Sequence, residues 1–494
     1  MKRLLLISMV LVLAAQVAPA QDSLGVADRT FLRLKPLAGA QQTLLYKGTP
    51  SYTEASAGYR LRSEDDAFVP QEGRGLGVFF FQADAAHRLD ARSAVEGGAG
   101  YERGVKRGVR MNTSSDWDLL YPYHTADTVG GDLQKEQYSF HGAYYHSFGS
   151  VFLGGGIRFR ALHEFRAQDP RPRNIVSDLQ GKISVGTESG PSVFSLDLLA
   201  GKYHQSQDIE FLDPRGHNTS ILHMAGLGQH YGRFAGSASS MDARFRGLEA
   251  GAVLRMEPRQ GTGWFSSLGY DAHRYVRHIK NQNEAPLSRL WVQEVRLEGG
   301  FKAADALYKG SVVYESRRGK EAVLDVKGAY LSLLDLPLYD QNSLKASLSA
   351  LRSWEGAEAV WTLCPEAGFS YLQSTGLNPE RSLSLSAAEV SLGGNRLSRK
   401  GDWVYRLQAG LDGRFMLGKT LSLPEGKTDK TLYDHYLSMT DRWGAHAGRL
   451  TLGAFIQREL SERVSLFGNG EAGGTLYSDG HYALAAALRI GFIF

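Results

Sequence analysis

Histidine and cysteine are the side chains of this sequence that most readily bind metals or act as nucleophiles, but their spacing argues against both roles. His141 and His146 share a strand-like segment and are five residues apart, which places them on opposite faces of a strand. His217 and His223 fall in an expected loop, without a ligand pattern. Cys364 is the one cysteine, and we expect it to be an inert, inward-pointing side chain. The sequence therefore predicts no metal site.

Motifs for catalysis and cofactor binding are equally weak. The run Gly154 to Gly156 lies in a strand pattern without a following helix, so it does not form a phosphate loop. Glycine at such a place lets neighbouring parts of the sheet approach closely. The net charge of +4 implies no nucleic-acid partner. We predict a protein that is not an enzyme and has no cofactor; a membrane-embedded hydrolase assembled across strands remains an alternative.

A third set of reactive side chains consists of charged residues at alternate positions of otherwise apolar segments. Both signs are interspersed, and two interpretations are open. The charges either pair with one another and maintain the shape of a barrel, which we favour, or contact a solute. These candidates for lining the lumen are Arg158, Arg160, Asp197, Glu249, Arg255, Asp271, Glu294, Arg296, Glu298, Glu366, Arg406, Asp412, Glu471 and Arg489.

The elements that must position these charges are β-strands. Trp403, Tyr405 and Leu407, for example, alternate with Arg406 and Gln408, and successive side chains of a strand point to opposite faces. After the N-terminal segment no apolar run is long enough for a membrane helix, which needs about 20 residues. Barrel strands alternate between lipid-facing apolar and lumen-facing polar residues. The pattern predicts an all-β protein, a transmembrane antiparallel β-barrel.

We expect about 18 strands; 16 would remain if the weak segments 52–63 and 92–103 were not strands. The expected strands are 52–63, 75–90, 92–103, 136–147, 150–163, 175–187, 191–204, 242–256, 262–278, 288–303, 306–317, 343–354, 357–374, 382–394, 399–416, 447–458, 461–476 and 481–494.

The gaps between these strands alternate between short and long. Outer-membrane barrels have this pattern because their periplasmic turns are short and their extracellular loops are long. We therefore expect the turns near Gly190 and Gly261 to face the periplasm. The expected extracellular loops are 104–135, 205–241, 318–342 and 417–446.

The first of these loops is rich in aromatic residues. It contains Trp117, Tyr121 and Tyr123, which favours a loop that folds over the mouth of the barrel or binds a partner. The alternative is that the long loops only shield the top of the barrel.

The N-terminal region predicts export. A basic start and an apolar run precede Ala18, Pro19 and Ala20, so residues 1–20 are expected to be a signal peptide cleaved between Ala20 and Gln21. Residues 21–51 are too apolar for a free tail; they either plug the lumen, as in fatty-acid-transport-like barrels, or form a periplasmic segment. Residues 52–494 are expected to form the barrel.

The last strand predicts the route of assembly. It ends in Phe492 and Phe494 on one apolar face, which resembles the C-terminal signal recognised by the barrel assembly machinery. The expected location is the outer membrane, with the lipid bilayer and lipopolysaccharide as surroundings.

The chain as a whole resembles the large Bacteroidota outer-membrane barrels that form a family of unknown function. The resemblance rests on the Ala18-Pro19-Ala20 signal followed by Gln21, on the sequence DPRPRN from Asp169 to Asn174, and on the C-terminus. It implies an outer-membrane location and cooperation with a TonB-dependent receptor, and it brings no catalytic residues.

Three functions are consistent with these observations. We favour a channel or transport-associated barrel for small solutes. The second is an accessory barrel that docks a TonB-dependent receptor, a surface lipoprotein or a secretion apparatus, and the third is the membrane-embedded hydrolase.

Overall fold

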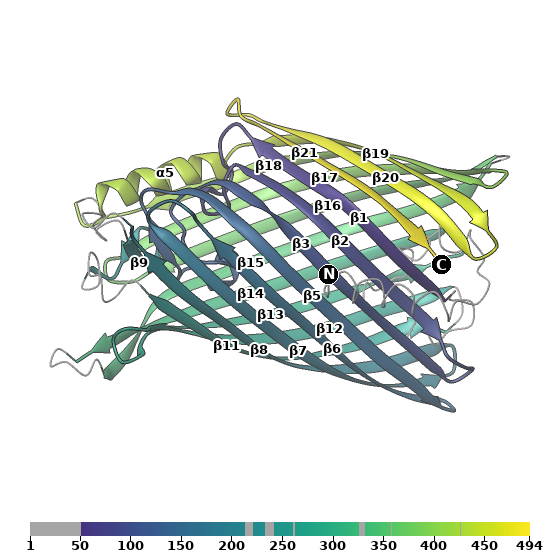
Figure 1. The fold of residues 1–494 in the computed structure, drawn as a ribbon, viewed down its shortest axis with the longest axis horizontal. Coiled ribbons are helices and arrows are strands. Elements are labelled where there is room, and N and C mark those ends of the chain that lie inside the picture. The colour runs from purple at the N-terminus through teal and green to yellow at the C-terminus, as the bar shows by residue number, and fades with distance from the viewer. Residues whose placement is uncertain are drawn as a thin grey trace.

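Eighteen antiparallel strands close into one barrel in a computed structural model of the chain (Figure 1). The structure describes residues 51–212, 221–232, 242–259, 262–325, 331–356, 358–424 and 426–494. The expected signal peptide and all of the segment 21–51 except its last residue lie outside the described residues. No helix in the described part of the chain is long and apolar enough to cross a membrane.

Each barrel strand pairs with the next one along the chain, and the last strand pairs with the first. The barrel strands are β1 Tyr52–Glu64, β2 Gly75–Arg88, β3 Ser93–Val109, β5 Gly131–Phe148, β6 Val151–Phe165, β7 Arg171–Ser189, β8 Ser192–Glu210, β11 Ala243–Pro258, β12 Gly263–Ile279, β13 Ala285–Lys302, β14 Ala306–Leu324, β15 Ser332–Glu355, β16 Ala359–Gly376, β17 Arg381–Lys400, β18 Trp403–Ser422, β19 Ala447–Ser461, β20 Val464–Tyr477 and β21 Tyr482–Ile493.

The seam between β1 and β21 is closed by the backbone of the last residue. The Phe494 amide donates to the Thr53 carbonyl at 2.8 Å, and the Thr53 amide donates back to the Phe494 carbonyl at 3.1 Å. The prediction of an all-β closed barrel with eighteen strands is confirmed, and the weak segments near 52–63 and 92–103 are both strands. That Phe492 and Phe494 guide assembly stays a prediction.

The outer surface of the barrel carries an apolar band between two sets of aromatic side chains. Leu198, Leu268, Leu363 and Leu407 are exposed in the middle of the strands. Such an outward apolar belt bounded by aromatic girdles is typical of transmembrane barrels. The exposed aromatic side chains are Phe148, Phe194, Trp264, Tyr308, Trp361 and Tyr405 toward one end and Tyr138, Tyr270, Tyr314, Phe369, Phe415 and Tyr482 toward the other.

The two ends of the barrel differ in their connections. At one end, called the turn end, β5 and β6 are joined by residues 149–150, and β17 and β18 by residues 401–402. At the other, called the loop end, the connections 110–130, 211–242 and 423–446 are long. Figure 1 shows β9 Ile221–Gly226 and α5 Lys430–Trp443 at the loop end and the C-terminus toward the turn end.

The prediction of a long loop at residues 318–342 is wrong. Residues 318–342 are mostly strand, because β14 continues to Leu324 and β15 begins at Ser332. The side chain of Arg318 points outward and is 75% exposed, so this hairpin extends past the apolar belt. Polar residues there lie on both faces of the strands, and the alternation of apolar and polar residues is therefore not visible in the sequence. The other expected loops are shortened by the same extension of the strands, and Gly261 lies outside the described residues.

Candidate functional site

The connection between β3 and β5 turns into the barrel at the loop end instead of projecting from it. It carries the short helix α4 Trp117–Leu120 and the strand β4 Thr125–Asp127. Arg160, on the inward face of β6, donates two hydrogen bonds of 2.9 and 2.7 Å to the two carboxylate oxygens of Asp116. Asn174 and Gln207, on β7 and β8, both donate to the Thr113 carbonyl at 2.7 Å. The connection is thus fastened to the wall formed by β6, β7 and β8.

The same connection also reaches a part of the wall six strands farther round the barrel. Arg317 on β14 donates to the Asp118 and Tyr121 carbonyls, and the Tyr121 ring lies 6.0 Å from that of Tyr339 on β15. The segment therefore crosses the interior, as the aromatic content of 104–135 had suggested for a loop that folds over the mouth.

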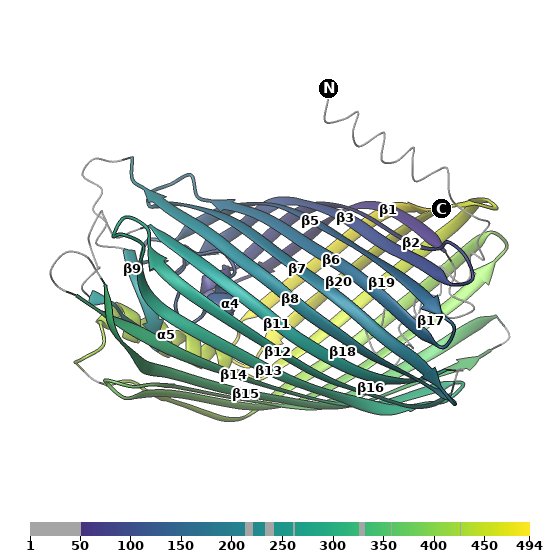
Figure 2. The same ribbon diagram turned by 90° about the horizontal axis from the view of Figure 1, so that it is seen from below.

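Two further segments complete this obstruction. β9 Ile221–Gly226 pairs with β4 and with β10 Gln229–His230 in a separate three-stranded sheet. The helix α5 Lys430–Trp443 buries Leu432, Tyr436 and Met439 in the same apolar core as Trp117 and Met224. Both views place β9 and α5 at the same end of the barrel (Figures 1 and 2). Residues 110–130, 221–232 and 429–443 are together called the plug.

Charged and titratable groups are buried inside the plug. Arg166 and Asp127 form an ion pair of 3.0 Å with both side chains almost fully covered. Arg277, on the inward face of β12 and 1% exposed, donates to the His124 carbonyl at 2.9 Å. Burial, reinforced by the positive charge of Arg277, lowers the pKa of the His124 imidazole to about 3. The plug is therefore held by charged contacts as well as apolar packing.

The cross-strand register shows where the predicted lumen residues lie. Directly opposed residues share a face of the sheet. All fourteen fall on the inward face, namely Arg158 and Arg160 on β6, Asp197 on β8, Glu249 and Arg255 on β11, Asp271 on β12, Glu294, Arg296 and Glu298 on β13, Glu366 on β16, Arg406 and Asp412 on β18, Glu471 on β20 and Arg489 on β21.

Several of these charges pair across neighbouring strands. Arg255 lies 2.6 Å from an Asp197 carboxylate oxygen, and Lys309 lies 2.9 Å from Glu298. In the same way Arg489 lies 3.0 Å from Glu54. Arg296 pairs with Glu294 within β13. These contacts match the interpretation that wall charges brace the barrel. Arg160 is different, because it binds the plug.

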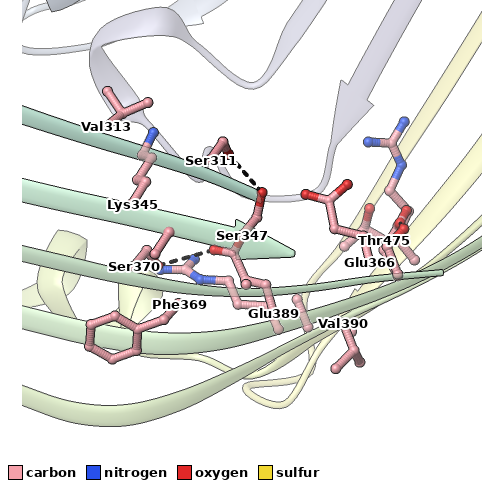
Figure 3. Close-up of a pocket in the computed structure, with 18 of the residues that line it drawn as sticks. Ser311, Val313, Lys345, Ser347, Glu366, Phe369, Ser370, Glu389, Val390 and Thr475 are labelled. Carbon is pink, nitrogen blue, oxygen red and sulfur yellow. Dashed lines mark hydrogen bonds between the residues drawn. The ribbon is translucent and has the colours of Figure 1, made fainter. Parts of the chain in front are cut away.

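A cavity of about 690 Å³ opens on the inward wall formed by β14 to β20 (Figure 3). It is called the chamber. Glu366 and Asp412, two of the predicted lumen residues, line it. The sequence interpretation missed four other charged residues of the same wall, although the alternation in their strands placed them on the inward face. They are Lys345, Glu389, Arg414 and Arg449.

The chamber is connected to the plug by Phe68, from the β1–β2 connection. The Phe68 ring stacks on Tyr477 with the ring centroids 5.4 Å apart. The Trp443 indole nitrogen, at the end of α5, donates to the Phe68 carbonyl at 2.8 Å, and the guanidinium of Arg442 lies 4.0 Å from the Tyr477 ring centroid. A movement of α5 would therefore displace Phe68 and Tyr477, which line the edge of the chamber.

Other predicted chemistry stays apart from the chamber. His141 faces a second, smaller recess of about 290 Å³ together with Asp84 and Arg489, while His146 accepts or donates a hydrogen bond at 2.9 Å with Ser93 on the outer side. Gly154 serves packing: a Cβ there would lie 2.2 Å from a ring carbon of Tyr145. Among the described residues, no three His, Cys, Asp or Glu side chains lie close enough to hold a metal ion.

Comparison with solved structures finds bacterial receptors at low similarity. The siderophore receptor PiuA of Acinetobacter baumannii has 7% identity and a TM-score of 0.41, covering 90% of this chain and 82% of that chain. The ferric yersiniabactin uptake receptor FyuA of Yersinia pestis has 10% identity and a TM-score of 0.40, covering 90% and 79%. A mutant of the ferric enterobactin receptor PfeA of Pseudomonas aeruginosa has 9% identity and a TM-score of 0.37, covering 89% and 80%.

The sequence comparisons are more specific. No curated protein matches the sequence. Residues 42–494 match the model of DUF6850. Since that match extends over the whole barrel, the chain belongs to this family of unknown function.

Proposed function

We propose that this protein is an outer-membrane, transport-associated barrel for small solutes whose outer mouth is closed by its own loops. The observation that carries the proposal is the plug, which contacts two parts of the inner wall, six strands apart, through Arg160 and Arg317. Behind it lies a polar interior with the charged chamber. A barrel that served only as a membrane anchor would need neither a polar chamber nor a closure coupled to it.

The orientation follows from the two ends. Short turns face the periplasm and long loops face the outside in barrels of this kind, so the loop end with its plug is assigned to the cell surface. The apolar belt between aromatic side chains such as Trp361 and Phe369 supports insertion in a bilayer. Recovery of the protein in the soluble fraction after lysis without detergent would contradict the location.

Reconstitution tests the transport role. The full-length protein should show low conductance in planar bilayers, since the plug crosses its interior. A variant in which residues 112–126 are replaced by a short Gly/Ser linker should conduct ions and admit small solutes into liposomes. Replacement of residues 401 and 402, in the β17–β18 turn at the turn end, is the matched control. This variant should keep the low conductance of the full-length protein. A folded variant without residues 112–126 that stays silent would contradict the transport role and favour an accessory barrel.

A further inference from the structure

The six charged side chains of the chamber make no ion pairs within the described chain. Three are cationic and three are anionic, on adjacent strands of one wall. Hydroxyl groups are the partners of two of the carboxylates: Ser370 donates to Glu389 at 3.1 Å, and Ser391 donates to Asp412. The six residues are Lys345, Glu366, Glu389, Asp412, Arg414 and Arg449.

Elsewhere on the inner wall, several neighbouring charges of opposite sign are paired. Arg255 pairs with Asp197 at 2.6 Å, and Glu102 contacts both Lys135 and Arg60. Neighbouring charges of opposite sign thus do form ion pairs on this wall. In the chamber, Asp412 stands directly opposite Arg449 in the β18–β19 register, yet the two side chains do not pair. The chamber thus gathers six charged side chains without ion pairs on neighbouring strands around one cavity.

We propose that the chamber binds zwitterionic solutes, in particular short peptides with a free ammonium and a free carboxylate group. This inference rests on the proposed transport function and names its substrate class. The equal numbers of cations and anions give the wall no preference for a simple anion or cation. A solute that carries one charge of each sign can satisfy both kinds of side chain at once, through charge-assisted hydrogen bonds.

The spacing of the strands sets the size of the solute. Glu389 lies on β17 and Arg449 on β19, two strands apart, which is roughly 10 Å at ~4.8 Å per strand. An extended chain spans ~3.3–3.6 Å per residue, so a peptide of about three residues matches this separation. A cavity of about 690 Å³ is also within the usual range of ligand pockets, roughly 300–1,000 Å³.

Several side chains of the chamber can be followed in Figure 3. Figure 3 shows Lys345, Ser347 and Glu366 along one wall, with Glu389 and Thr475 nearby. In the bound state the ammonium group would lie toward Glu366 and Glu389, and the carboxylate toward Arg414 and Arg449. The ring of Phe68 forms part of the same lining and offers an apolar surface to a side chain of the peptide.

Calorimetry with purified protein in detergent tests the proposal. The probe is trialanine, compared with N-acetyl-trialanine amide, which has the same backbone without the two charges. We expect trialanine to bind at least tenfold more tightly. Both the full-length protein and the variant without residues 112–126 are measured, so that access through the mouth does not limit binding.

Substitutions locate the site. Glu366→Gln combined with Glu389→Gln should weaken trialanine binding by about tenfold or more, and Arg449→Gln should do the same, because each removes a charged hydrogen-bonding partner. Glu462→Gln and Arg463→Gln, in the β19–β20 turn, are matched controls that should bind as the unchanged protein does. Equal binding of the blocked and free peptides, or equal effects of chamber and control substitutions, would overturn the proposal.

Conductance separates this inference from the function on which it rests. If the variant without residues 112–126 conducts but does not discriminate between the two peptides, the zwitterion proposal is wrong and the transport role stands. If trialanine binds and depends on Glu366, Glu389 and Arg449 while both proteins stay silent in bilayers, the transport role is wrong and the binding site stands.

Discussion

Arg160 holds Asp116 through two parallel hydrogen bonds, of 2.9 and 2.7 Å, and thereby joins the barrel wall to the start of the plug. Both side chains are largely covered, and the Tyr203 hydroxyl donates to the same carboxylate at 3.0 Å. Asp116 has a positive φ of 50°, a conformation that Asn also adopts readily. Asp116→Asn therefore removes the charge without adding backbone strain.

We expect Asp116→Asn to destabilise the closed plug by about 1.5–3 kcal/mol, the usual contribution of a hydrogen bond to a charged group. Single-channel recordings should show more frequent openings, and a protease added from the loop end should cut residues 110–130 faster. Glu459→Gln is the matched control, since Glu459 receives a similar pair of 3.1 Å hydrogen bonds from Arg399 at the turn end. Equal opening in both variants would show that Asp116 does not hold the plug.

The plug should loosen in acid. Burial lowers the pKa of His124 to about 3, from an ordinary value of 6.5, and burial likewise lowers the pKa of His435 on α5 to about 4. An opened plug returns both side chains to water, where they take up protons below pH 6.5. The closed plug therefore keeps its full stability above about pH 6.5. As the pH falls from there toward the lowered pKa values, each of the two histidines reduces this stability by up to ~1.4 kcal/mol per pH unit.

Proteolysis or conductance at pH 7.5 and pH 4.5 measures this effect. His124→Gln keeps an amide that can donate to the Met111 carbonyl, which His124 Nε2 contacts at 3.3 Å, but it cannot take up a proton. The substitution should reduce the acid response, and combining it with His435→Gln should reduce it further. An unchanged acid response in the double variant would mean that other groups control the opening.

The sequence predicted the barrel because its strands repeat a two-residue alternation, clear in Trp403, Tyr405 and Leu407. The same signal failed where the strands rise above the apolar belt. In the β14–β15 hairpin Arg318 and Asp340 are both outward and exposed, so neither face is consistently apolar. The prediction of a loop at 318–342 was wrong for this physical reason.

The plug was only partly foreseeable. Trp117, Tyr121 and Tyr123 marked the connection as too aromatic to project freely into water. Its place depends on contacts between distant segments, such as Tyr121 with Tyr339 and Arg317 with the Asp118 carbonyl. Local periodicity carries no information on these pairs. The chamber could not be predicted for the same reason, because it is a space between several strands and no single strand contains it.

Substitutions on neighbouring residues should distinguish the two faces of the wall. Leu407 points outward and is 57% exposed, so Leu407→Arg should destabilise the barrel by roughly 2–4 kcal/mol if it lies near the bilayer midplane. Gln408 points inward beside Gly453, and Gln408→Arg should be tolerated. Denaturant unfolding in lipid vesicles measures both, and equal damage would contradict the assigned face of β18.

The orientation of the barrel can be tested at four glycines with open space around them. Gly426 and Gly480 lie in loop-end connections, and Gly190 and Gly401 lie in turn-end connections; all four have positive φ and no atom within 4 Å of a Cβ built on them. Short epitope tags inserted beside them should disturb packing little. This choice avoids residues 110–130, where a tag would have to fit inside the barrel and would prevent closure.

Antibodies should stain intact cells that carry tags at Gly426 or Gly480. Tags at Gly190 or Gly401 should be stained only after the outer membrane is permeabilised, which also shows that those tagged proteins are present. The opposite result would place the plug at the periplasmic mouth, so solutes would enter the chamber freely from outside and meet the closure last. Staining of one tag from each end on intact cells would contradict the barrel topology itself, because successive antiparallel strands place alternate connections on the same side of the membrane.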